Sequence, residues 1–144
     1  MTALEKIPIL VEAPEAAAQS YLNTLPLLHE ILHALRRLHR DGTSTALDLL
    51  AMPFGPGDEA RLFEFLGNGE LSAELDAMGQ SSIRESRFSG VWIIEHKSSG
   101  GRRVALQIEV TRLPAILQTQ PEDIGAGLDA MQEALETLKA GEPV

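Results

Sequence analysis

Apolar residues recur at every second position between Glu70 and Thr111, and this periodicity restricts the chain to folds that contain a sheet. The alternation runs through four segments with turns at Met78-Gly79, Ser89-Gly90 and Ser98-Ser-Gly-Gly101. Successive side chains of a strand point to opposite faces, so alternation of this kind is typical of strands in an antiparallel sheet. The pattern predicts a four-stranded antiparallel meander, and residues 43–50 predict a fifth strand.

A helical pattern precedes the sheet, at residues 25–40. Asn23 or Thr24 is the expected N-cap, Pro26 falls in the first turn, and Asp41-Gly42 follows the end. The apolar side chains of this segment spread over more than half of the helix circumference. One face of a sheet would not cover so wide an arc, so we expect a neighbouring helix or another chain to cover its second side.

A second long helix is predicted after the sheet, from Pro121 to about Lys139, with Pro121-Glu-Asp as its N-terminal signal. It carries one apolar stripe: Ile124, Leu128, Met131, Leu135 and Leu138. Between the first helix and the meander, a loop rich in proline and glycine leads to Asp58, a natural N-cap for a short helix that ends at Gly67.

These elements predict an α+β fold of two layers, in which about five mostly antiparallel strands are packed against the long N-terminal and C-terminal helices. We expect residues 1–20 to form a flexible tail, residues 21–140 a single domain, and residues 141–144 a frayed C-terminus. Within the tail, the apolar patch from Ile7 to Val11 is also suited to pairing with a sheet edge or a partner.

Composition excludes several functional classes. The chain has 144 residues, no cysteine and a net charge of −9, from 21 acidic and 12 basic side chains. A nucleic-acid backbone would be repelled by this charge, and thiolate chemistry has no residue to perform it. The patch from Ile7 to Val11 is too short for a membrane span and lacks the features of a secretory signal. We expect a cytoplasmic protein without membrane insertion.

One motif favours a zinc site. His29-Glu30-Ile-Leu-His33 matches H-E-x-x-H, and His39 falls where the extended metalloprotease pattern has its third ligand. That pattern needs a glycine where this chain has Arg36, and a helix that continues would carry His39 about 100° away from the pair. The third ligand would then have to come from Glu59 or Glu64. We expect the two histidines to lie on a solvated face, and a zinc-dependent hydrolase is the alternative.

Several short segments, taken in order, resemble a known family. They are Leu25-Pro-Leu-Leu-His-Glu-Ile-Leu-His-Ala-Leu35, Met52-Pro-Phe-Gly-Pro-Gly-Asp-Glu59, Leu66-Gly-Asn-Gly-Glu-Leu71, Gly90-Val-Trp-Ile-Ile-Glu-His96 and Ile108-Glu-Val-Thr-Arg-Leu-Pro-Ala-Ile-Leu117. Together they are similar to the C-terminal conserved region of the HupH/HyaF hydrogenase-expression proteins, which are bacterial accessory factors for making nickel-iron hydrogenases.

The resemblance implies a non-enzymatic, chaperone-like accessory protein. Its expected partner is the precursor of the hydrogenase small, iron–sulfur subunit, or a fellow assembly factor. The resemblance transfers no catalytic residue, metal ligand or cofactor to this chain. Longer family members carry the unit more than once, so a short member is expected to form a homodimer. A purely structural dimerisation module is a further alternative.

The expected partner-binding residues are those in the family-like segments that local structure does not fully explain. They are Phe54, Pro56, Asp58, Trp92, His96 and Glu109. Trp92 has two interpretations, because its strand is apolar on both faces: core packing, or an aromatic anchor for a partner.

Overall fold

The structure is a computed structural model that describes residues 23–141. The chain divides into two compact units, Met1–Arg112 and Leu113–Val144, and each is described by itself. In order, the elements of the first unit are α2 (Leu25–Asp41), β1 (Thr45–Asp48), the 3-10 helix η1 (Leu49–Ala51), α3 (Asp58–Leu66), β2 (Ser72–Asp76), β3 (Gln80–Glu85), β4 (Val91–Lys97) and β5 (Arg103–Val110). The second unit has the 3-10 helix η2 (Ala115–Leu117) and α4 (Pro121–Lys139).

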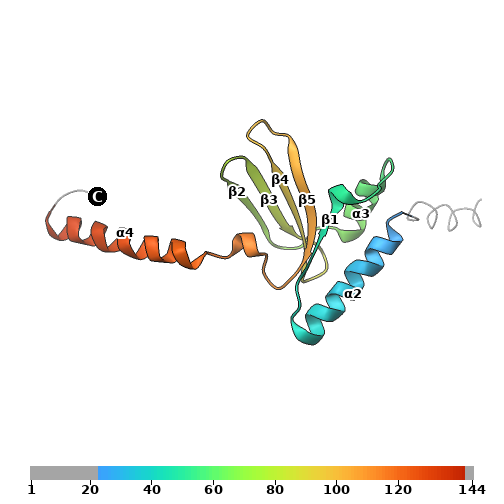
Figure 1. Ribbon diagram of the computed structural model, residues 1–144, viewed down its shortest axis with the longest axis horizontal. Helices are drawn as coiled ribbons and strands as arrows, with labels where there is room; N and C mark the ends of the chain where they lie inside the picture. The colour runs from blue at the N-terminus through green and yellow to red at the C-terminus, as the bar shows by residue number, and fades with distance from the viewer. Residues whose placement is uncertain (1–22, 142–144) are drawn as a thin grey trace, which may run out of the picture. The chain divides into compact units, whose positions relative to one another are not determined.

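The five strands form one antiparallel sheet in the order β1-β5-β4-β3-β2 (Figure 1). This confirms the α+β class and the meander. Two strand boundaries differ. Strand β1 covers only Thr45–Asp48 of the predicted residues 43–50, and β3 ends at Glu85, whereas the turn predicted at Ser89-Gly90 places its end at Phe88. The Oγ of Ser86 accepts a hydrogen bond from the Phe88 backbone N–H and donates one to the Phe88 carbonyl. These local bonds form a turn, which competes with continued pairing of the strand.

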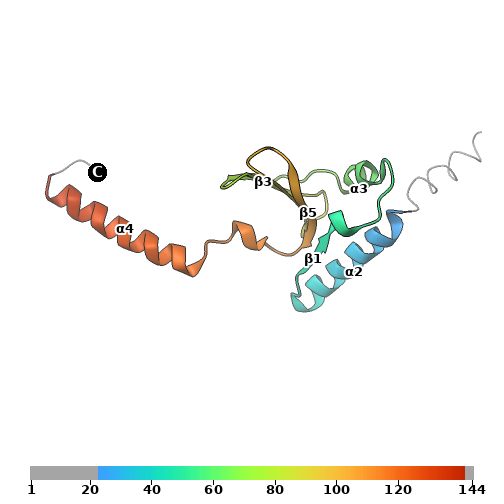
Figure 2. The same ribbon diagram turned by 45° about the horizontal axis from the view of Figure 1, so that its top comes forward.

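One face of the sheet is covered by α2 and α3 (Figures 1 and 2). Helix α2 begins and ends as predicted, with Thr24 as N-cap and Gly42 in the left-handed conformation after its last turn. The core on this face is built from α2, η1, α3 and the three strands β1, β4 and β5. Its buried members are Leu27, Ile31, Ala34, Leu47, Leu49, Leu62, Leu66, Val91, Ile93, Leu106, Ile108 and Val110.

The opposite face of the sheet carries a second set of buried side chains, Ile83, Trp92 and Ile94. Trp92 is 4% exposed, and its indole Nε1 donates a hydrogen bond of 3.1 Å to the backbone carbonyl of Thr111. The central strand β4 is therefore apolar on both faces because both of its faces are buried.

Asp58 fixes the start of α3, although the N-cap itself is Gly57, with φ 83°. The buried Asp58 carboxylate accepts hydrogen bonds from the Gly55 backbone N–H at 2.6 Å, from the Asn23 side chain at 3.0 Å and from Arg61 at 3.0 Å. The prediction that Asp58 is the N-cap is wrong by one residue. Its carboxylate reaches back to the preceding loop and to the residue before the N-cap of α2.

Helix α4 has the predicted bounds, but it has no buried residue. Its apolar stripe is 48% to 67% exposed at each of the five positions. Within its own unit the stripe of α4 therefore remains uncovered, whereas α2 buries its apolar face within the first unit.

Candidate functional site

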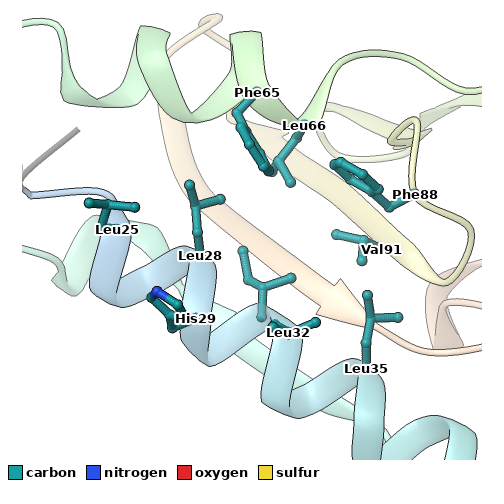
Figure 3. Close-up of a pocket in the computed structure, with 10 residues that line it drawn as sticks. Leu25, Leu28, His29, Leu32, Leu35, Phe65, Leu66, Phe88 and Val91 are labelled. Atoms are coloured by element: carbon teal, nitrogen blue, oxygen red, sulfur yellow. The ribbon is translucent and has the colours of Figure 1, made fainter. Parts of the chain in front are cut away.

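An apolar groove of about 290 Å³ lies between α2 on one side and α3 with the β3–β4 turn on the other (Figure 3). We refer to it as the leucine groove. Its lining residues are Leu25, Leu28, His29, Ile31, Leu32, Leu35, Phe65, Leu66, Phe88 and Val91. Nine of these ten side chains are apolar, so the groove is suited to apolar groups and offers little to a polar ligand.

The α2 wall of the leucine groove arises from the wide apolar arc of that helix. Ile31 packs into the core, whereas Leu25, Leu28, Leu32 and Leu35, three or four residues apart, form a row along the second side of the helix. Leu25 remains 41% exposed and Leu32 remains 42% exposed. The sequence predicted that this side would be covered, and α3 covers only part of it.

The opposite wall is a stacked aromatic pair held by an arginine. The rings of Phe65 and Phe88 lie 5.6 Å apart between centroids. The guanidinium of Arg87 lies 5.1 Å from the Phe65 centroid and 4.5 Å from that of Phe88, and its Nε donates a 2.7 Å hydrogen bond to the Phe65 carbonyl. These contacts join α3 to the β3–β4 turn, so the wall is fixed before any ligand arrives.

Positive charge borders the leucine groove. At the C-terminal end of α2, a second hollow shares Leu35 with it and is lined by Arg36, His39 and Arg112, with Glu85 as its one carboxylate. The basic residues outnumber the acidic ones around this hollow, whereas the whole chain has a net charge of −9. A segment that combines apolar side chains with acidic ones would complement both hollows.

The six residues predicted to bind a partner fall into two groups on opposite faces of the sheet. Phe54 is partly buried and packs against the hydrophobic core, Pro56 is exposed in the same loop, and Asp58 is buried at the start of α3. Trp92 and Glu109 pair across β4 and β5 on the other face, where His96 also points. The structure therefore does not bring the six residues together into one site.

His96 and Glu109 lie near each other on that second face. The Nδ1 of His96 lies 2.6 Å from the Oγ of Ser81, within hydrogen-bond distance. Burial raises the pKa of the Glu109 carboxyl, and a hydrogen bond with Gln107 and the nearby His96 oppose that shift.

Replacing Glu109 with glutamine is expected to raise the melting temperature at neutral pH more than at low pH. Because the pKa of Glu109 is higher in the folded chain than in the unfolded chain, the carboxyl group stabilises the fold most when it is protonated. This contribution to the free energy of unfolding is complete below the unfolded pKa of about 4.5 and is lost as the pH rises through the folded pKa. Glutamine is neutral at every pH and removes this loss. Thermal unfolding by circular dichroism, at about pH 4 and about pH 7, measures the difference. An equal effect at both pH values would contradict the assignment.

The H-E-x-x-H motif lies on the exposed side of α2. His29, at the rim of the leucine groove, and His33 are both exposed, and the helix continues through Arg36 to Asp41. Among residues 23–141, no group of three or more histidine, cysteine, aspartate or glutamate side chains is arranged to hold a metal ion. Neither Glu59 nor Glu64 therefore completes a site with the two histidines.

The signal for the leucine groove was present in the sequence as the excess apolar arc of α2. The contribution of Phe65 and Phe88 to it was not predicted, since they come from distant segments. In the part of the chain that the structure describes, no helix has the length and apolar character to cross a bilayer. Fold and groove together define a small α+β domain that displays an apolar groove beside basic residues.

Comparison with known proteins identifies the family. Residues 21–138 match the model of the HupH hydrogenase expression protein, C-terminal conserved region, and the chain belongs to this family. The solved structure of the hydrogenase expression protein HupH from Thiobacillus denitrificans ATCC 25259 is similar, with a TM-score of 0.76 and 36% identity, over 79% of this chain and 95% of that one.

Two curated relatives agree. The hydrogenase expression/formation protein HoxQ of Azotobacter vinelandii is 30% identical over 92% of this chain and 46% of its own length. The corresponding HupQ of Azotobacter chroococcum mcd 1 is 28% identical over 82% of this chain and 42% of its own length. The chain thus spans less than half the length of these relatives.

Proposed function

We propose that this protein is a non-enzymatic accessory factor in nickel-iron hydrogenase maturation. In this proposal it acts in the cytoplasm and binds the precursor of the small subunit, or another assembly factor, through the leucine groove. The observation that carries the proposal is the groove itself, an apolar surface that remains open after α2 and α3 have packed on the sheet. Family membership supplies the hydrogenase context.

The shape and chemistry of the leucine groove favour a helical ligand. Four leucines in a row on α2 face a fixed aromatic wall, which matches the way an amphipathic helix inserts apolar side chains at positions i, i+3 or i+4, and i+7. Arg36 and Arg112 would attract acidic residues at one end of that helix. We therefore propose an amphipathic, acidic-flanked segment of the client as the ligand.

The same lining argues for binding without catalysis. His29 is the one residue lining the leucine groove that carries a titratable side chain, and none of the other nine provides a hydroxyl, thiol, amine or carboxylate. Acid–base and nucleophilic catalysis both require such groups to be placed together in a pocket. This composition supports a role in protein binding.

Co-purification tests the proposal. The affinity-tagged protein is isolated from cells induced for hydrogenase synthesis, and the bound proteins are identified by mass spectrometry. We expect a hydrogenase subunit precursor or assembly factor to be enriched over cells in which hydrogenase synthesis is not induced. If no hydrogenase component is retained, the proposed function is wrong.

A further inference from the structure

The exposed stripe of α4 has the spacing of a helix–helix interface. Its members are four, three, four and three residues apart, which is the alternation of coiled-coil core positions. They are exposed by 60%, 66%, 67%, 48% and 57% at Ile124, Leu128, Met131, Leu135 and Leu138. We refer to these five residues as the α4 seam. Apolar exposure of this extent along a helix of 19 residues is typical of an interaction surface.

Charge on α4 is arranged around the α4 seam. The carboxylates of Asp129 and Glu133 occupy positions on the far side of the helix, away from the seam, whereas Glu136 borders the seam in the last turn, together with Lys139. The positions that flank the seam are small or uncharged until the last turn: Gly125, Gly127, Gln132 and Ala134. Small, neutral flanks let a second helix approach closely without placing its charges beside these carboxylates.

We propose that the α4 seam binds the α4 seam of a second copy of this chain, as an antiparallel helix pair. The first turn of α4 is acidic, with Glu122 and Asp123, and its last turn carries Lys139. An antiparallel pair places Lys139 of each copy at the level of the acidic first turn of the other. A parallel pair would instead set like charges side by side. Opposed helix dipoles favour the antiparallel arrangement as well.

The register follows from the seam. In an antiparallel coiled coil, each core layer pairs an a position of one helix with a d position of the other. Ile124 therefore lies opposite the partner's Leu135, and Leu128 lies opposite the partner's Met131. Leu138 then packs on the partner's Pro121. This single register engages all five seam residues of both helices. The contact is the same in both directions and closes into a two-fold dimer. It goes beyond the proposed function and does not involve the leucine groove.

Size-exclusion chromatography with light scattering tests the pairing. The wild-type chain is expected to have twice its 15.6 kDa mass in the micromolar range. Leu135→Glu removes an apolar contact and places a charge in the seam, so it should raise the dissociation constant by at least about 100-fold. Ala130→Glu adds the same charge on the outer side of α4 and should remain dimeric. Fluorescence of Trp92, the one tryptophan, confirms that the first unit is folded in both variants.

Cysteine cross-linking tests the orientation, since the chain has no cysteine of its own. A mixture of Ile124→Cys and Leu135→Cys chains should form a disulfide-linked heterodimer under mild oxidation. Ile124→Cys alone should not cross-link, because the two copies of residue 124 would be about 16 Å apart along the helix axis. The pairing is excluded if the wild-type chain is monomeric, or if Leu135→Glu and Ala130→Glu behave alike. Efficient cross-linking of Ile124→Cys alone would overturn the antiparallel orientation.

Discussion

Replacing Leu32 with aspartate is expected to weaken capture of the hydrogenase partner by about 100-fold without unfolding the domain. Leu32 lines the leucine groove and is 42% exposed, so the folded chain tolerates a polar atom at this position. A bound helix would cover the site and remove the new carboxylate from water without a partner for its charge. The measurement is the amount of client retained in the co-purification, followed by calorimetric titration of the identified partner.

The matched control for Leu32→Asp is Leu50→Asp. Leu50 lies in η1, is 50% exposed and does not line the leucine groove, so the same substitution there should leave client capture unchanged. Equal losses in both variants would mean that the effect arises from net charge. If Leu32→Asp retains the client as well as the wild-type chain does, the client binds elsewhere, and the face of Trp92, His96 and Glu109 becomes the next surface to test.

Replacing Trp92 with alanine is expected to lower the free energy of unfolding by about 3–5 kcal/mol. The indole is 4% exposed at the centre of the sheet, so truncation leaves a large cavity. It also removes the donor for the buried Thr111 carbonyl. Of the two interpretations of Trp92, these contacts support core packing. Urea unfolding followed by circular dichroism measures the change.

Trp92→Phe separates the two interpretations. Phenylalanine keeps most of the ring volume and loses only the hydrogen bond to Thr111, so it should cost about 1 kcal/mol and leave the domain folded. Normal client capture by this variant would be consistent with a core role. Loss of capture from a folded Trp92→Phe protein would instead make the ring a binding residue.

Local elements were predictable because their signals are local. Pro26 near the start of α2 and Gly42 after its end mark that helix, and alternation marks β5. The β3 boundary was misplaced because residues 86–88 continue the alternation, whereas the side chain of Ser86 ends the strand. A hydrogen bond between a side-chain hydroxyl and the backbone two residues away cannot be detected from the periodicity of apolar residues.

The candidate site was only half predictable. Excess apolar surface on α2 was visible in its sequence, but the wall made by Phe65, Phe88 and Arg87 depends on two segments that fold next to each other. The family-like segments yielded six candidate residues, and the sheet register separates Phe54 from Trp92 and Glu109. Sequence similarity to a family identifies residues by their position along the chain, but it does not indicate which face of a sheet each residue occupies.

The sequence by itself determined the fold class, the positions of the two long helices, the number of strands and the family, because each follows from periodicity, end signals or segment order along the chain. Tertiary structure alone decided that β1 joins the sheet beside β5 and that α3 covers only part of α2. An amphipathic pattern predicts that the apolar face of a helix will be buried. What covers it, and how completely, is a property of contacts between residues far apart in the chain.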